Sequence, residues 1–327
     1  MQTTFFGKLH AQGIISDASF TKIKQQEDKQ LLSVHWELKT LLYLGILLLT
    51  TGLGIIVYKN IDTIGHQAIL VFIALLSAGS FYYCIKTKPP FSLNKTEAPN
   101  LFFDYVLVLG CLSFISFIGY LQFQYHVFGT RYGLASFIPL IVLFFSAYYF
   151  DHPGILSLAI TNLAAWAGIA VTPTRILAEN DFNSNSIIFT GLLLGVLLIL
   201  AGLATQKKQI KKHFEFTYSN FGTHILFISC LAAMFNFDAT YLLWFLLLLG
   251  LSLFFYLKAQ AEKSFYYMLL LTLYGYIGVG YVVIRLLFFT SNNSDMGAIY
   301  IALLYFIASA IGMVVFLIRM NKKLKAV

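Results

Sequence analysis

The sequence contains few charged residues. Asp, Glu, Lys and Arg make up 11% of its 327 residues, whereas soluble domains carry about 25%. So little charge cannot cover the surface of a water-soluble fold of this length, which excludes a soluble globular protein. The apolar residues instead gather in runs of roughly 20, the length that an α-helix needs to cross a hydrocarbon core of about 30 Å.

Cysteine is also scarce, and no cysteine motif is present. Cys84, Cys111 and Cys230 all fall within apolar runs, and none belongs to a Cys-x-x-Cys pair. Neither a zinc site nor a disulfide framework is therefore predicted, and we expect three small buried apolar groups. No metal and no cofactor is predicted. A cleavable signal peptide is not expected either, because the first apolar run begins near Leu38, behind a charged segment.

Ten apolar runs predict an all-α fold, a polytopic transmembrane helical bundle of about ten spans. A short cytoplasmic helical hairpin in residues 1–37 precedes the bundle, and in it Gly13 ends the first helix and Ser16 caps the second. We expect the membrane domain over residues 38–319 and a basic cytoplasmic tail over residues 320–327. The seventh span is the shortest and least apolar. The spans are predicted near residues 38–58, 65–85, 102–124, 133–150, 153–172, 186–204, 220–236, 239–257, 264–288 and 297–318.

Lysine and arginine are distributed unevenly between the two sides of this bundle. With the N-terminus in the cytoplasm, 18 of the 22 Lys and Arg residues fall on the inner side, and only Lys59, Arg131, Arg175 and Arg285 fall outside. The positive-inside rule then predicts that both termini are cytoplasmic. The net charge of +8 is attributed to the anionic cytoplasmic leaflet, so membrane lipids are predicted partners and nucleic acid is not.

The longest inner loop, TQKKQIKKHFEFTYSN, combines lysines with phenylalanines. Lys207, Lys208, Lys211 and Lys212 are predicted to lie on one side of a short amphipathic helix that faces the lipid. Such a helix would hold the loop at the membrane surface with its charges among solvent and headgroups.

The fifth span carries an amide near its middle. Asn162 stands in a helix that is rich in alanine and glycine, and Trp166 follows one turn later. Small residues let helices approach closely, so we expect this helix inside the bundle. Two interpretations remain open. In the favoured one, Asn162 hydrogen-bonds to a neighbouring helix, and in the other, Asn162 and Trp166 line a central cavity and contact a substrate.

The ninth span places Tyr274, Tyr281 and Arg285 on one face. Tyr274 and Tyr281 are candidates for the same cavity. Arg285 lies near the outer end, where we expect its side chain to reach the interface. The alternative is an ion pair with Asp238, Asp181 or Asp295.

No pattern of catalytic residues orders the polar side chains of the outer loops. These residues show no His-x-x-x-His, Asp-x-Asp or Gly-x-Ser-x-Gly spacing, so no catalytic residue and no metal ligand is predicted. No span holds a buried acidic residue, which argues against a proton-relay pump. His224 stands alone within its span, so a pair of haem ligands is not predicted. The outer loops contain Asp62, His66, His126, Arg131, Arg175, Glu179, Asp181, Asp238 and Asp295.

The N-terminal region resembles a known family. The segment LHAQGIISDASFTKI is similar to the helical hairpin that opens the bacterial DUF2157 proteins, and LGILLLTTGLGIIVYKNIDTIG is similar to their glycine-spaced first helix. That helix ends in an Asn-Trp-Asp-like motif, of which Asn60 and Asp62 match while Ile61 replaces the Trp. The resemblance implies a multi-pass protein of the bacterial inner membrane and implies no particular activity. From the residues themselves, Asn60 is expected to end the first span and Asp62 to cap the second.

Three classes of function remain open. The first is a transporter or flippase-like carrier of a small amphipathic or lipid-linked molecule, with Asn162, Trp166, Tyr274, Tyr281 and Arg285 as candidate substrate contacts. The second is an envelope scaffold or assembly subunit that binds a protein partner through the N-terminal hairpin. The third is a membrane enzyme that acts at the outer face, and we expect this class less than the other two.

Overall fold

The computed structural model describes residues 35–59, 65–171, 185–290 and 296–326, together with residues 10, 12, 13, 15–17 and 19–21 of the head. The chain forms two compact units, residues 1–65 and 66–327. Asn60 and Asp62 lie outside the described residues, so the roles expected of them stay predictions.

The first unit contains helix α3 (His35–Lys59), which corresponds to the first predicted span. The head residues that are described turn where the sequence predicted. Gly13 adopts a positive φ of 70°, and the Ser16 hydroxyl accepts a hydrogen bond from the Ser19 amide at 3.4 Å. The His10 ring stacks on Phe20 with a centroid distance of 4.4 Å, so the two sides of the predicted hairpin are in contact.

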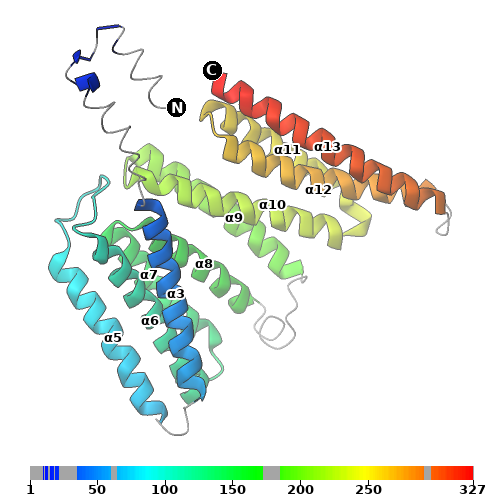
Figure 1. The fold of residues 1–327 in the computed structure, drawn as a ribbon. Helices are drawn as coiled ribbons and strands as arrows, with labels where there is room; N and C mark the ends of the chain where they lie inside the picture. The colour runs from blue at the N-terminus through cyan, green and yellow to red at the C-terminus, as the bar shows by residue number, and fades with distance from the viewer. Residues whose placement is uncertain are drawn as a thin grey trace. The chain divides into compact units, whose positions relative to one another are not determined.

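The second unit is a series of antiparallel helix pairs. Consecutive helices pack as α5/α6, α7/α8, α9/α10 and α11/α12, and α13 packs along α12 (Figure 1). Short 3-10 helices, η2 (Lys212–Phe214) and η3 (Asp238–Thr240), precede α10 and α11. The helices are α5 (His66–Thr87), α6 (Leu101–Tyr125), α7 (Tyr132–Phe150), α8 (Pro153–Val171), α9 (Asn185–Lys208), α10 (Glu215–Asn236), α11 (Tyr241–Ala261), α12 (Phe265–Thr290) and α13 (Met296–Ala326).

This all-helical architecture confirms the predicted fold class and agrees with about ten spans. Eight helices of the described residues are long and apolar enough to cross a membrane. The other two long helices contain shorter apolar stretches, Thr40–Ile56 in α3 and Pro153–Gly168 in α8.

Helix α10 is the centre of the second unit. It packs against α8, α9, α11 and α12. Its span has the lowest hydropathy of the eight and the largest buried share, 56%. The two properties have one cause, because buried Thr217, Ser219, Thr223 and Ser229 face protein rather than lipid. The helix also begins at Glu215, earlier than the predicted start at residue 220.

Glycines bring α9 and α10 into close contact. A Cβ atom added to Gly222 would lie 3.0 Å from the Gly195 carbonyl oxygen and 2.8 Å from Cγ1 of Ile199. Gly202 likewise faces Ser219, with 3.0 Å between its added Cβ and the hydroxyl oxygen. The seven-residue spacing of Gly195 and Gly202 therefore serves this helix contact.

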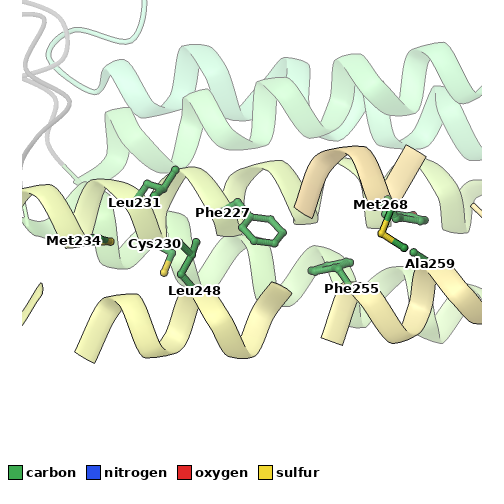
Figure 2. Packing of buried hydrophobic residues seen from close by; sticks show 9 residues of the cluster. Phe227, Cys230, Leu231, Met234, Leu248, Phe255, Ala259 and Met268 are labelled. Atoms are coloured by element: carbon green, nitrogen blue, oxygen red, sulfur yellow. The ribbon is translucent and has the colours of Figure 1, made fainter. Parts of the chain in front are cut away.

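An apolar cluster of buried residues lies between α10, α11 and α12 (Figure 2). Cys230 belongs to it, and Cys84 and Cys111 are also buried and unpaired, which confirms the prediction for the thiols. The Phe227 ring packs on Phe255 with a centroid distance of 5.6 Å. The cluster consists of Phe227, Cys230, Leu231, Met234, Leu248, Phe255, Ala259, Tyr267 and Met268.

Three connections of the second unit meet at one end, as the predicted alternation of the spans requires. The α5–α6 connection meets the α7–α8 turn, because the Thr96 amide donates to Asp151 at 2.6 Å. It also meets the α9–α10 connection, because the Lys211 amide donates to the Leu93 carbonyl at 2.8 Å. We call this the lysine-rich end. Which end faces the cytoplasm stays a prediction.

Candidate functional site

An apolar groove runs between α7, α8, α9 and α10. It encloses about 480 Å³, and its walls are almost entirely carbon. Alanines on α8 and α9 leave the space, and the Trp166 ring closes one side while packing against Phe137 at a centroid distance of 5.3 Å. Leu193 and Leu197 at its margin are 62% and 52% exposed. The groove is lined by Phe144, Leu163, Trp166, Ala167, Ala170, Thr190, Leu193, Leu194, Leu197, Leu198, Ala201 and Tyr218.

Asn162 lies on the same helix but does not line this groove. Its side-chain oxygen is buried and accepts no hydrogen bond within the described part of the chain. That oxygen therefore does not form the predicted bond to a neighbouring helix among these residues. A buried acceptor without a partner costs about 1–3 kcal/mol. Packing alone therefore does not explain why the side chain at position 162 is polar.

A second apolar groove of about 410 Å³ lies between α5, α6 and α7. Ala74 and Ala78 leave space there, as the alanines of α8 do in the first groove. No tryptophan borders it, and its polar lining comes from hydroxyl groups such as that of Ser77, which donates to the Gly110 carbonyl at 3.0 Å. Because this groove is similar in volume but has no tryptophan, it serves as a control for the groove beside Trp166.

Tyr274 belongs to a chain of hydrogen bonds between α10 and α12. Its hydroxyl lies 2.7 Å from Nδ1 of His224, and Nε2 of His224 lies 3.0 Å from the Tyr266 hydroxyl. The Tyr266 hydroxyl donates to Oδ1 of Asn220 at 2.5 Å. With that proton committed, Tyr266 accepts from Nε2–H of His224, and Nδ1 accepts from Tyr274. This assignment gives a neutral His224 in one tautomer.

Tyr274→Phe is expected to lower the free energy of unfolding by about 0.6–2 kcal/mol, as for other hydrogen bonds within a membrane. The loss leaves Nδ1 of His224 without its donor. It can be measured by unfolding in mixed micelles with increasing SDS. Tyr82→Phe is the control, because Tyr82 is 70% exposed. Equal effects of the two substitutions would contradict this role of the hydrogen bond.

Tyr281 and Arg285 meet at the opposite end from the lysines. Nη1 of Arg285 donates to Oδ1 of Asp238 at 2.6 Å and to the Tyr281 hydroxyl at 2.7 Å. The guanidinium also lies 4.3 Å from the centre of the Tyr241 ring. The predicted alternative, an ion pair with Asp238, is therefore present. Asp238 is 77% exposed in its side chain, so this surface pair contributes little to stability.

The structure does not bring the predicted site residues together in one pocket. Asn162 and Trp166 lie on α8, whereas Tyr274, Tyr281 and Arg285 lie on α12. The groove beside Trp166 has no lining residue from α12. Helix α10, which packs against both α8 and α12, carries the partners of Tyr274.

An ion cluster lies buried at the lysine-rich end. Lys211 is 1% exposed and Asp151 is 3% exposed in the side chain, and Nζ of Lys211 lies 3.1 Å from Oδ1 of Asp151. Nε2 of His213 lies 2.7 Å from the same oxygen, while the other oxygen accepts from the Thr96 amide at 2.6 Å and hydroxyl at 2.8 Å. Burial alone would raise the pKa of Asp151. The bonds from Thr96 and the adjacent Lys211 and His213 outweigh burial and hold that pKa below its ordinary value.

The predicted amphipathic helix over this loop is wrong. Helix α9 continues to Lys208, the chain turns, and η2 follows at Lys212. Lys211 points inward to Asp151, and Phe214 is fully buried. A buried carboxylate supplied by the α7–α8 turn overrides the tendency of a lysine to stay in water.

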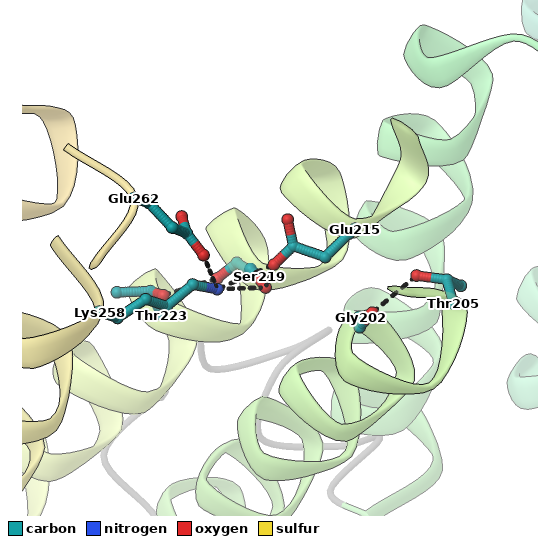
Figure 3. Close-up of polar contacts among 7 residues, drawn as sticks. All are labelled: Gly202, Thr205, Glu215, Ser219, Thr223, Lys258 and Glu262. Carbon is teal, nitrogen blue, oxygen red and sulfur yellow. Dashed lines mark hydrogen bonds and ion pairs between the residues drawn. The ribbon is translucent and has the colours of Figure 1, made fainter. Parts of the chain in front are cut away.

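A second ion cluster joins α10 to the end of α11 (Figure 3). Nζ of Lys258 donates to Glu215 at 2.8 Å and to the Ser219 hydroxyl at 3.0 Å, and Ser219 donates to Glu215 at 2.7 Å. Glu262 lies 3.7 Å from Lys258. Burial raises the pKa of Glu262, Lys258 lowers it, and the neighbouring carboxylate of Glu215 raises it again, so that it lies above its ordinary value.

The polar face of α10 was not predicted from the sequence. Asn220 and His224 stand four residues apart in EFTYSNFGTH, which places them on one helix face. This four-residue spacing of polar side chains, within a span of low hydropathy, is the sequence feature from which the polar face could have been predicted. Within the described ranges no three His, Cys, Asp or Glu side chains are grouped to hold a metal ion.

Comparison with known proteins supports a membrane location. Residues 7–156 match the DUF2157 family, which is described as a predicted membrane protein. The resemblance inferred from the head and the first span is thus confirmed over this region. No curated protein and no solved structure matches the chain.

Proposed function

Proceeding from the match of residues 7–156 to a membrane protein family, we propose that this protein is a carrier of an amphipathic or lipid-linked molecule. The apolar chain of that molecule would occupy the groove beside Trp166. The observation that carries this proposal is a space of about 480 Å³ with apolar walls and a tryptophan at one side. Sites of this volume and lining suit a chain-bearing small molecule.

The arrangement of helix pairs supports movement at this groove. The groove lies between the α7/α8 pair and the α9/α10 pair, so displacement of one pair against the other would open or close it. The hydroxyls of Tyr148 and Tyr218 lie 2.9 Å apart, and Tyr218 borders the groove, so polar atoms are available beside the apolar chain. Asn162 lies one turn from Trp166 but does not border the groove, so its buried, unbonded acceptor would reach the molecule only when the helix pairs move.

The membrane and its orientation form part of the proposal. The distribution of lysine and arginine supports an orientation with both termini in the cytoplasm, and the resemblance to the DUF2157 proteins supports a location in the bacterial inner membrane. In that orientation the lysine-rich end contacts the cytoplasmic leaflet.

Ala201→Phe is expected to weaken chain binding by about tenfold or more, because the new ring occupies space in the groove. Binding can be followed by quenching of Trp166 fluorescence with a brominated single-chain amphiphile in detergent. Every protein in this experiment also carries Trp36→Phe and Trp244→Phe, so that Trp166 is its sole tryptophan.

The control is Ala78→Phe, which fills the groove between α5, α6 and α7 instead. It should leave the titration unchanged. Quenching that does not saturate, or that is the same in the Ala201→Phe and parent proteins, would refute chain binding in this groove.

A further inference from the structure

A polar pocket of about 470 Å³ opens at the lysine-rich end. Two connections that are distant in sequence form it. The α5–α6 connection contributes Asn94 and Lys95, and the α9–α10 connection and the start of α10 contribute Gln209, Lys212, His213, Glu215 and Phe216. Its amide and ammonium groups contrast with the carbon walls of the two grooves.

The free charge in this pocket is positive. Lys95 and Lys212 are exposed and form no ion pair with any residue that the structure describes. Glu215 also borders the pocket, but its carboxylate is paired with Lys258 at 2.8 Å, and that ammonium lies farther, 3.7 Å, from Glu262. His213 lies against the carboxylate of Asp151. Two uncompensated ammonium groups therefore remain for an anion.

The backbone beneath the pocket is held in a strained form. Gln209 and Lys211 adopt positive φ angles of 56° and 48°, a conformation that costs a side-chain-bearing residue energy and clusters at ligand sites. The Lys211 amide bonds to Leu93, and Nζ of Lys211 donates to the Asn94 carbonyl at 3.4 Å. These bonds tie the two connections together and fix Lys95 and Lys212 around one pocket.

The pocket also lies where the apolar spans end. Helix α9 stops at Lys208 and α10 begins at Glu215, so in the proposed membrane orientation the residues between them would lie at the level of lipid headgroups. We propose that this pocket binds a phosphate group through Lys95 and Lys212. A phospholipid headgroup and free phosphate share this chemistry. The proposal is independent of the groove, which a different variant tests.

The test uses the purified full-length protein in neutral detergent and native mass spectrometry. Phosphatidic acid is compared with phosphatidylcholine of the same chains, with inorganic phosphate as competitor. The Lys95→Gln/Lys212→Gln variant is expected to bind phosphatidic acid about tenfold or more weakly. Lys322→Gln/Lys323→Gln, which removes two exposed lysines from α13, should bind within about twofold of the parent. Thermal unfolding of both variants verifies that they remain folded.

Each outcome decides the proposal. Selective loss in the Lys95→Gln/Lys212→Gln variant supports it. Displacement of phosphatidic acid by inorganic phosphate then identifies free phosphate as a ligand, and resistance to displacement identifies the lipid headgroup. Equal losses in the two double variants, or equal binding of the two lipids by the parent protein, would overturn it.

Discussion

Asp151→Ala is expected to lower the free energy of unfolding by about 3–5 kcal/mol, the cost of leaving a buried charge without its partner. Lys211 is 1% exposed, so its ammonium group is shielded from the solvent that could replace the lost carboxylate. The Thr96 amide loses its acceptor as well. Unfolding in mixed micelles with increasing SDS measures the change.

The double variant Asp151→Ala/Lys211→Met provides the control. Removing both charges should recover a large part of the loss, because no isolated ammonium remains buried. A double variant as unstable as the sum of the two single variants would show that the ion pair is not the cause.

Protonation of Asp151 in this cluster is expected to destabilise the protein in acid. The pKa of Asp151 is lowered in the folded protein, so its contribution is present above the unfolded pKa of about 3.9 and is lost as the pH falls through the folded value. Asp151→Ala should lack this part of the pH dependence, which a comparison of unfolding at pH 7 and below pH 4 would reveal.

Gly222→Ala is expected to lower the free energy of unfolding by about 1–3 kcal/mol through overpacking. The new Cβ would meet the Gly195 carbonyl oxygen at 3.0 Å and the Ile199 amide nitrogen at 3.1 Å. These are backbone atoms, so no side chain can move aside, and α9 and α10 must separate. The same SDS titration measures the effect.

Gly79→Ala and Gly250→Ala are the matched controls, since an added Cβ meets nothing within 4 Å at either position. Alanine favours the helix over glycine by about 0.8–1.0 kcal/mol, so these variants should be unchanged or slightly more stable. Loss of stability in all three variants would refute the argument from close packing.

Lys211 shows why part of the site could not be predicted. In the sequence it is one of four lysines in a loop, and such a pattern is typical of a solvated surface. Its burial depends on Asp151, which lies in a different connection and has no sequence feature that pairs it with Lys211. Helix α10 is similar, because its polar residues predict a weak span while their partners on other helices make it the central one.

The linear sequence was sufficient to predict the helical membrane class, about ten helices and the resemblance of the N-terminal region to the DUF2157 family. Hydropathy and turn signals are local properties, summed over about 20 residues, so the linear order is sufficient to read them. The tertiary structure alone decided which polar groups pair, where Trp166 meets an apolar space, and which lysines remain free for an anion. Those outcomes depend on contacts between residues far apart in the chain, whose distances no local pattern encodes.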